Sequence, residues 1–516
     1  MSPAGGVLDP ERTPVVIGAG QCVSRDFSLA PLELAAEAAR MALSPKMGLR
    51  RRIGRVSVVD ILGGGAGRSP ASDLARCLGI TGAACETTTI GGSTPQALVE
   101  RAANDIAAGR LEATLVAGAE SLRSGRLGTA ATARPTAGRP GPADPVVGST
   151  RGDLPAGERA AGLTLPIFVY PLFESVLAAR AGRSPDEQRA FVGELLAPFS
   201  KVASNSPYAW FRESLSADDI AVPRPGNRLV AEPYTKRMTA FLGGAHGAAL
   251  LVTSLGFARR HRLAESPMFV WGAASASEVV SLAARRDLGR CEALEIAASA
   301  ALAQAGTGVD EMGHLDVYSC FPSAVQIGAS ALGVGGGDPR GLTLTGGLPY
   351  FGGPGSNYVT HSIATLFERL RDQGGHGADA SGLVTGVSWY LTRSSVGIYG
   401  AGPPPSGSYR PADSAALVRL QRRIDADALQ TLSSPERPVE AVVEASTVVY
   451  DRMGTARSAP VVATLPDGSR VAAAASEGEA VQVAGRFLPG QRVVIYPAAA
   501  GVPPGSPPTY RLAGGS

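Results

Sequence analysis

Apolar residues recur at two spacings along this chain, and the alternation between these spacings predicts its architecture. Short apolar or β-branched runs, such as residues 13–20 and 115–118, are typical of buried strands. In the stretches between such runs, for example residues 31–43 and 290–305, apolar residues return every three or four positions, as they do on one face of a helix. Strand and helix patterns that follow one another in this way predict an α/β protein.

Residues 84–121 combine a strand, a glycine turn, a helix and a second strand. The first strand ends at Gly91 and Gly92, and Ser93 and Thr94 offer caps for the helix that follows. Such a turn brings free backbone N–H groups and the positive end of a helix to one place, so an oxygen-rich or thioester ligand could be held there. The alternative is a plain strand–helix–strand crossover that carries no site.

Another glycine turn is predicted at Gly18-Ala-Gly, where the first strand pattern ends. A dinucleotide site would need a third glycine at the right distance, and the sequence has none there. We therefore do not favour a dinucleotide-binding function.

The order of strands and helices repeats in the second half of the chain, which suggests an internal duplication. The repeated elements include a long glycine turn that leads into a helix. They are the strands 268–274 and 315–319, the helices 290–305 and 323–332, the glycine turn 346–357 and the helix 358–372.

Residues 122–240 separate the two similar units and have a different composition. Gly, Ala, Thr and Pro dominate residues 123–151, which predicts an excursion over the surface. Helices are predicted at residues 165–181 and 184–203. For the aromatic group at residues 208–211 we favour packing over a role as the cap of a pocket.

Beyond residue 402 the pattern changes again. A proline-rich linker precedes an amphipathic helix at residues 413–432 and then several short β runs, with a hairpin turn signal at Pro466-Asp-Gly-Ser. These runs predict a small β-barrel, perhaps of OB type, although the sequence offers few aromatic residues for stacking on nucleic acid. Packing against the core or binding a partner is the favoured role. The predicted strands are 439–450, 459–465, 471–475, 480–483 and 492–496.

Composition and charge narrow the possible functions. The chain has 516 residues, 44% hydrophobic and 18% charged, with a net charge of +3, and it contains no basic run interleaved with aromatics, so no nucleic acid partner is expected. Its five cysteines and five histidines show no metal-ligand spacing, and no metal site is expected. Without a signal core or a membrane-length apolar run, we expect a cytoplasmic protein with no membrane insertion.

The motifs together resemble the thiolase superfamily, on the side of the sterol-carrier-protein thiolases. Within that branch the sequence is similar to the thiolase-like proteins of type 1, which carry an additional C-terminal domain. The resemblance covers roughly residues 13–400. It implies a thiolase fold, in which duplicated βαβαβαββ halves pack as a five-layered αβαβα sandwich.

The resemblance also implies where the domains lie. We expect an N-terminal half at residues 1–255, which includes a loop domain at about 122–240. A C-terminal half is expected at residues 256–402, and an additional domain, a helix followed by the small barrel, at residues 403–516.

The reacting side chains of thiolases are missing at the matching positions. The stretch Ser93-Thr-Pro-Gln-Ala resembles the S-G-x-Q-A part of the nucleophile motif, which places Gly91 where the cysteine stands. Gly353 stands where the GHP motif has its histidine, and Tyr318 replaces the histidine of the HDCF motif. The region of the last motif, residues 384–390, contains no cysteine. The resemblance therefore implies no acyl-cysteine chemistry, because losing one member of a cooperative catalytic set already costs several orders of magnitude.

Weaker candidates for chemistry remain near the expected pocket. Cys85 and Cys320 are more typical of buried apolar residues than of nucleophiles, and His361 is more typical of packing or of the surface. Tyr318 and Asn357 could donate hydrogen bonds to a carbonyl group, or could simply complete a strand end and a glycine turn. The candidate ligand-binding residues are Gly92, Ser93, Thr94, Gly352 and Ser356.

The resulting hypothesis is a thiolase-like protein of the acyl-CoA acyltransferase superfamily, binding acyl-CoA or a related thioester in lipid metabolism. No tightly bound cofactor is expected, and CoA or acyl-CoA is the expected ligand. Two alternatives stay open: a residual acyl transferase or thioesterase that uses non-covalent oxyanion chemistry, and a non-catalytic protein that interacts with a partner through its C-terminal domain. The chain is expected to be a monomer or a homodimer.

Overall fold

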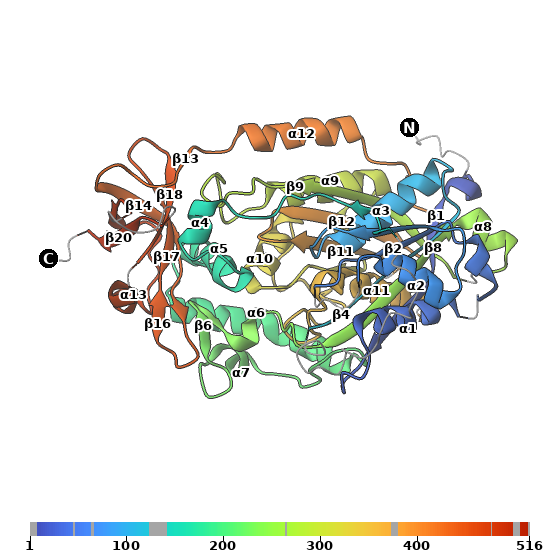
Figure 1. Ribbon diagram of the computed structural model, residues 1–516, viewed down its shortest axis with the longest axis horizontal. Helices are drawn as coiled ribbons and strands as arrows, with labels where there is room; N and C mark the ends of the chain where they lie inside the picture. The colour runs from blue at the N-terminus through green and yellow to red at the C-terminus, as the bar shows by residue number, and fades with distance from the viewer. Residues whose placement is uncertain are drawn as a thin grey trace.

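The computed structural model describes residues 8–44, 47–62, 67–122, 142–263, 266–372, 380–475, 477–498 and 506–513. Residues 123–141 of the expected surface excursion lie outside these ranges. Figure 1 shows a large α/β body with a small β domain at one end. Within the described ranges, none of the helices is both long enough and apolar enough to cross a bilayer.

A mixed sheet of ten strands forms the framework of the body, in the order β10-β11-β12-β9-β1-β8-β4-β2-β3-β5. Its two halves meet where β1 pairs briefly with β9, at Val15 with Phe269 and Val16 with Met268. At one edge the two-residue strand β5 pairs with β3. The strands are β1 (Pro14–Val23), β2 (Arg55–Val58), β3 (Ala84–Thr88), β4 (Ala113–Ser121), β5 (Val146–Val147), β8 (Ala245–Ser254), β9 (Met268–Ser277), β10 (His314–Asp316), β11 (Ser381–Ser388) and β12 (Arg393–Gly400).

Helices lie outside and between the two halves of this sheet. On the N-terminal side, α1 (Pro31–Leu43) packs on the strands β1, β4 and β8. The helix α2 (Pro70–Leu78) packs on β2 and β3, and the short helix α8 (Leu255–Arg260) follows β8. On the C-terminal side α9 (Glu292–Ala305) packs on β9 and β12, with α10 (Pro322–Ala331) beside it. The helices α3 (Thr94–Ala107) and α11 (Tyr358–Asp372) contact strands of both halves. The expected five layers are thus confirmed, with α3 in the central one.

The glycine turn expected at Gly18 and Gly20 is wrong, because β1 continues through both residues to Val23. A Cβ atom at Gly18 would overlap the carbonyl oxygen of Ala42, and one at Gly20 would overlap that of Ala38. The glycines therefore let α1 approach the strand closely, and their role is packing rather than turning.

A segment between β5 and β8 stands apart from the layers and carries its own helices and strands. Its longest helix, α6 (Pro185–Asn205), starts at a capping box in which Ser184 and Glu187 satisfy each other's backbone N–H groups. The helices predicted at residues 165–181 and 184–203 are confirmed. The other elements are α4 (Ala156–Ala160), α5 (Pro166–Arg180), α7 (Ala217–Ala221), β6 (Leu229–Ala231) and β7 (Tyr234–Thr235).

The C-terminal strands close into a five-stranded barrel in the order β18-β17-β14-β19-β20, since β20 also pairs with β18. This confirms the small barrel expected from the sequence. Its strands are β14 (Val439–Ser446), β17 (Pro460–Thr464), β18 (Arg470–Ala474), β19 (Arg492–Tyr496) and β20 (Thr509–Leu512), with β13 (Thr431–Leu432) on the outside. A hairpin, β15 (Val449–Tyr450) and β16 (Ala456–Ser458), leaves the barrel, and its strand β15 pairs with β6, which in turn pairs with β7.

Two local predictions in this region are wrong. The linker helix α12 (Ser414–Ala426), which crosses the top of the view in Figure 1, ends before residue 432 because residues 431–432 pair with β18. Residues 480–483, predicted as a strand, belong to the helix α13 (Glu477–Val483). The short apolar run fits either structure, and the burial of Ala480 and Val483 one turn apart suits the helix.

Candidate functional site

The N-terminus of α3 lies where two glycine-rich turns meet. Gly91 has a φ of 147°, and its N–H donates a hydrogen bond of 3.0 Å to Oγ of Ser356, which lies near the end of the glycine turn 346–357, the second of the two. The hydroxyl of Thr94 donates to the carbonyl oxygen of Gly91 at 2.7 Å. The fold therefore brings Gly91, Thr94 and Ser356 together, although they come from opposite halves of the chain.

Ser93 occupies the N-cap position of α3, but its side chain makes no capping hydrogen bond, so the expected cap is wrong. Its hydroxyl instead lies 2.6 Å from Oγ of Ser388, and its backbone N–H donates to the same atom at 3.0 Å. Ser388 ends β11 and was missed by the sequence analysis, because only the packing of the two halves brings β11 to this turn.

No side chain fits at the two glycines of the first turn without displacing its neighbours. A Cβ atom at Gly91 would overlap Oγ of Ser388 and the guanidinium group of Arg393, and one at Gly92 would overlap the hydroxyl of Tyr318. The buried Tyr318 therefore packs against the start of α3, at the centre of the candidate site. The space in front of the helix is filled by this tyrosine, by Ser388 and by Arg393.

The cysteines near this region are poor nucleophiles. Cys320 is buried, and its burial raises the pKa of the thiol to about 12. Cys85 lies on β3, where partial burial also raises the pKa of its thiol above the usual value. Because the thiolate is the reactive form, a raised pKa lowers the fraction of both thiols that can react at neutral pH.

Asn357 lies just before α11 and His361 lies in the first turn of that helix, and both face other partners. The side-chain oxygen of Asn357 accepts a hydrogen bond of 2.6 Å from Thr360, and its Nδ2 has no partner among the described residues. Nδ1 of His361 lies 2.8 Å from the side-chain oxygen of Gln21, and burial holds the pKa of this histidine well below its usual value. His361 is therefore a neutral, fully buried residue.

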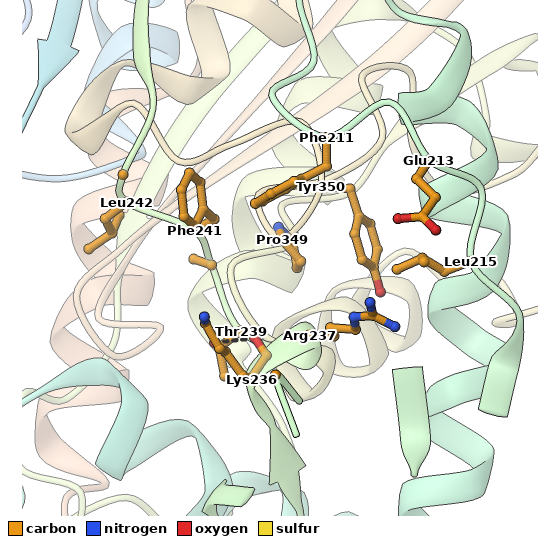
Figure 2. A pocket seen from close by; sticks show the side chains of 13 residues that line it. Phe211, Glu213, Leu215, Lys236, Arg237, Thr239, Phe241, Leu242, Pro349 and Tyr350 are labelled. Atoms are coloured by element: carbon orange, nitrogen blue, oxygen red, sulfur yellow. Dashed lines mark hydrogen bonds between the residues drawn. The ribbon is translucent and has the colours of Figure 1, made fainter. Parts of the chain in front are cut away.

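A cavity of about 460 Å³ lies next to the second glycine turn, as Figure 2 shows. The N–H of Gly353 donates to the carbonyl oxygen of Phe241 at 2.7 Å, and a Cβ atom at Gly353 would lie 3.0 Å from Cδ2 of Leu242. Phe241 and Leu242 both line the cavity, so Gly353 lies directly behind two of its lining residues. The full lining is Phe211, Glu213, Leu215, Gly226, Lys236, Arg237, Thr239, Ala240, Phe241, Leu242, Gly243, Pro349 and Tyr350.

The cavity has an apolar wall and a polar end. Phe211 and Phe241 are in edge contact at 4.7 Å between ring centroids. In Figure 2 the hydroxyl of Tyr350 points toward Arg237, and Lys236 lies to the left of both, beside Thr239. This hydroxyl is buried and has no hydrogen-bond partner among the described residues. An elongated ligand with an apolar part and an anionic part would match this lining.

No pattern in the sequence predicts this cavity. Its residues come from segments that are far apart in the chain and carry no common motif. The aromatic group at residues 208–211 was the available signal. The packing role favoured for it holds for Trp210, whose ring lies 5.3 Å from that of Phe27, while Phe211 both packs against Phe241 and lines the cavity.

His246 lies behind the second turn and is fully buried. A Cβ atom at Gly352 would approach Cε1 of His246 to 2.7 Å, so only glycine fits at residue 352. The imidazole stacks on Phe351, with 5.4 Å between the ring centroids. Burial lowers its pKa from 6.5 to about 4, so the ring is neutral at pH 7.

Replacing His246 by Phe is expected to reduce the acid sensitivity of the fold. A histidine whose pKa is lowered in the folded state contributes stability above pH 6.5, and this contribution is lost as the pH falls toward 4. The difference between the two pKa values corresponds to a change of roughly 3 kcal/mol in the free energy of unfolding across this pH range. Urea unfolding of both proteins between pH 7 and pH 4.5 measures this, and parallel stability curves for the two proteins would contradict it.

Comparison with known proteins places this geometry in context. No family model matches the chain, and neither does any of the curated proteins. Among solved structures, the chain is similar to a monomeric SCP2-thiolase-like protein type 1 from Mycobacterium smegmatis, with 30% identity, a TM-score of 0.82, and coverage of 98% of this chain and 100% of that one.

Two further structures share the fold at lower identity. The Ltp2–ChsH2(DUF35) aldolase is 20% identical with a TM-score of 0.58, and the match covers 77% of this chain and 99% of that one. The dimeric peroxisomal thiolase of Saccharomyces cerevisiae is 14% identical with a TM-score of 0.56, over 76% of this chain and 98% of that one. Both matches leave about a quarter of this chain uncovered.

Proposed function

The chain belongs to the SCP2-thiolase-like proteins of type 1 in the thiolase superfamily, and from this we propose that it binds an acyl-CoA or a related acyl thioester without forming an acyl-cysteine. The ligand lies in the cavity beside Gly353, with its thioester toward the two glycine turns. The observation that carries the proposal is the cavity of about 460 Å³, which is lined by the exposed cation Lys236 and by Phe241 and Leu242, the two residues that contact Gly353.

The lining of the cavity supports each part of this ligand. An acyl chain or the pantetheine arm would contact Phe211, Phe241 and Leu242, where burying apolar surface gains about 25 cal/mol per Å². Tyr350 offers a hydroxyl for a carbonyl or amide group of the ligand, since this hydroxyl lacks another partner among the described residues. Lys236 offers charge for a phosphate.

The first glycine turn supports a function without covalent catalysis. With Gly91 at the position of the nucleophile, the chain has hydrogen in place of the sulfur, and Ser388 and Arg393 occupy the space that a side chain there would need. We expect no cleavage of acetoacetyl-CoA in a thiolase assay. Hydrolysis of an acyl-CoA above the uncatalysed rate would instead support the residual thioesterase.

Filling the cavity is expected to weaken binding. Calorimetry should detect heat when the full chain is titrated with acyl-CoA, and the Ala240→Trp variant should bind at least about tenfold more weakly, because the indole occupies the space of the ligand. Ala426→Trp is the matched control, since Ala426 is exposed at the end of α12. Equal affinity of both variants would contradict the location of the site. An absence of heat with the wild-type protein would contradict binding itself and favour the interaction protein.

A further inference from the structure

A second cavity continues the first one toward the C-terminal barrel. It has a volume of about 520 Å³ and lies between the segment before β6 and the β15–β16 hairpin. Gly226 and Lys236 line both cavities, so the two adjoin at these residues. The lining of the second cavity is Pro223, Arg224, Pro225, Gly226, Arg228, Leu229, Lys236, Arg452, Met453 and Gly454.

This second cavity carries positive charge that the described part of the chain does not neutralise. Arg228 donates hydrogen bonds to the carbonyl oxygens of Leu229 and Asp451, at 2.7 and 3.2 Å, and to no carboxylate. Lys236 and Arg452 are exposed and form no ion pair with any residue that the structure describes. Arg224, by contrast, is paired with Asp219.

The hairpin holds Arg452 in a defined loop. Within it, the carboxylate of Asp451 accepts hydrogen bonds from the N–H groups of Met453 and Thr455, at 2.8 and 3.0 Å, and pairs with Arg457. The carbonyl oxygen of the same aspartate binds Arg228, which links the hairpin to the opposite wall. Arg452 of the hairpin thus lines the same groove as Arg228, which precedes β6, and Lys236, which follows β7.

We propose that the barrel completes the ligand site, with Arg452 of its hairpin holding the phosphates of the CoA nucleotide together with Arg228 and Lys236. This inference rests on the proposed function and names the part of the ligand that the first cavity leaves outside. Guanidinium and ammonium groups are the usual protein partners of phosphate, and their contacts are charge-assisted. Met453, which is 87% exposed beside Arg452, offers an apolar face to the adenine ring.

The attachment of the barrel fits this role. Val449 of the hairpin pairs with Ala231 of β6, and the N–H of Glu232 donates to the carbonyl oxygen of Val448 at 2.9 Å. These contacts fix the hairpin against the same segment that lines the first cavity. The C-terminal domain therefore forms one wall of the binding site.

The test is a charge reversal, Arg452→Glu, in the full chain. Calorimetry with acyl-CoA should show binding weakened by roughly tenfold or more, whereas an acyl-pantetheine, which lacks the nucleotide phosphates, should bind as it does to the wild type. Arg437→Glu is the matched control, because Arg437 is an exposed arginine at the start of the barrel outside this cavity. Its affinity for acyl-CoA should stay within a factor of about two of the wild type.

The outcomes separate this inference from the proposed function. Unchanged acyl-CoA affinity in Arg452→Glu, or an equal loss for acyl-CoA and acyl-pantetheine, overturns the role of the barrel and leaves acyl thioester binding in place. A wild-type protein that gives no heat with either ligand overturns both.

Discussion

Restoring the two side chains that thiolases use, by Gly91→Cys together with Gly353→His, is expected to yield no thiolysis and to lower stability by about 2–5 kcal/mol. Residue 91 has a φ of 147°, which costs a residue with a side chain on the order of 1–3 kcal/mol. The new Cβ would also overlap Ser388 and Arg393, and overpacking adds a cost of similar size.

The neighbours of Gly91 cannot move away easily. Ser388 is held by both the hydroxyl and the N–H of Ser93, at 2.6 and 3.0 Å. Arg393 donates to the hydroxyl of Thr89 at 2.9 Å and to backbone carbonyl oxygens. An introduced thiol would therefore shift the start of α3 rather than settle in an open pocket.

The measurement combines urea unfolding with an assay of acetoacetyl-CoA cleavage in the presence of CoA. Gly353→His alone serves as the control, since a Cβ atom there meets its nearest neighbour at 3.0 Å and its φ is not in the left-handed region. Adding Ser388→Gly to Gly91→Cys should recover part of the lost stability, because it removes one of the two overlaps. Turnover with an acyl group attached to the introduced thiol would refute this account.

Removing the buried cation Arg189 is expected to destabilise the protein by about 3–5 kcal/mol. Its guanidinium group lies 2.7 Å from the carboxylate of Glu232, whose side chain is only 1% exposed. Tyr450 of the barrel hairpin donates to the other oxygen of Glu232 at 2.9 Å. In Arg189→Met, the carboxylate of Glu232 keeps its hydrogen bond from Tyr450 but loses its counter-ion. Leaving a buried charge without its partner costs about 3–5 kcal/mol of stability.

A double-mutant comparison tests the origin of this loss. Arg189→Met combined with Glu232→Gln should be more stable than Arg189→Met alone, because the uncompensated charge is gone. Arg180→Met is the control, since Arg180 and Asp287 form an exposed pair at 2.6 Å that should contribute no more than about 1 kcal/mol. Urea unfolding measures all of these variants. A loss in Arg189→Met no larger than in the control would contradict the prediction.

Local patterns predicted the layers of the fold well. The helix at residues 31–43 and the helix at 358–372 have the expected bounds, because their apolar spacing and their burial in the core agree. Glycines were the weak point. Gly18 and Gly20 suggested a turn, whereas they serve close packing of α1 against β1, a role that depends on tertiary structure.

The candidate site also contains some residues that the sequence predicted and others that it could not predict. The motifs that contain Gly91 and Ser356 allowed both residues to be assigned to one candidate site from the sequence, and the structure places them in hydrogen-bond contact. Ser388, Arg393 and the cavity beside Gly353 could not be predicted, because they come together only when the two halves and the segment between them pack. Arg452 lies still further along the chain, in a domain outside the range of the thiolase motifs.

The two-residue strand β5 has a consequence beyond the site. It pairs with Thr87 and Thr88, so the end of β3 nearest the glycine turn already has a neighbour along its outer edge. Exposed sheet edges invite pairing with strands of other molecules, and short covering strands are one way in which proteins prevent it. Any association of two copies through this border would first have to displace β5, or be confined to the few residues of β3 that it leaves open.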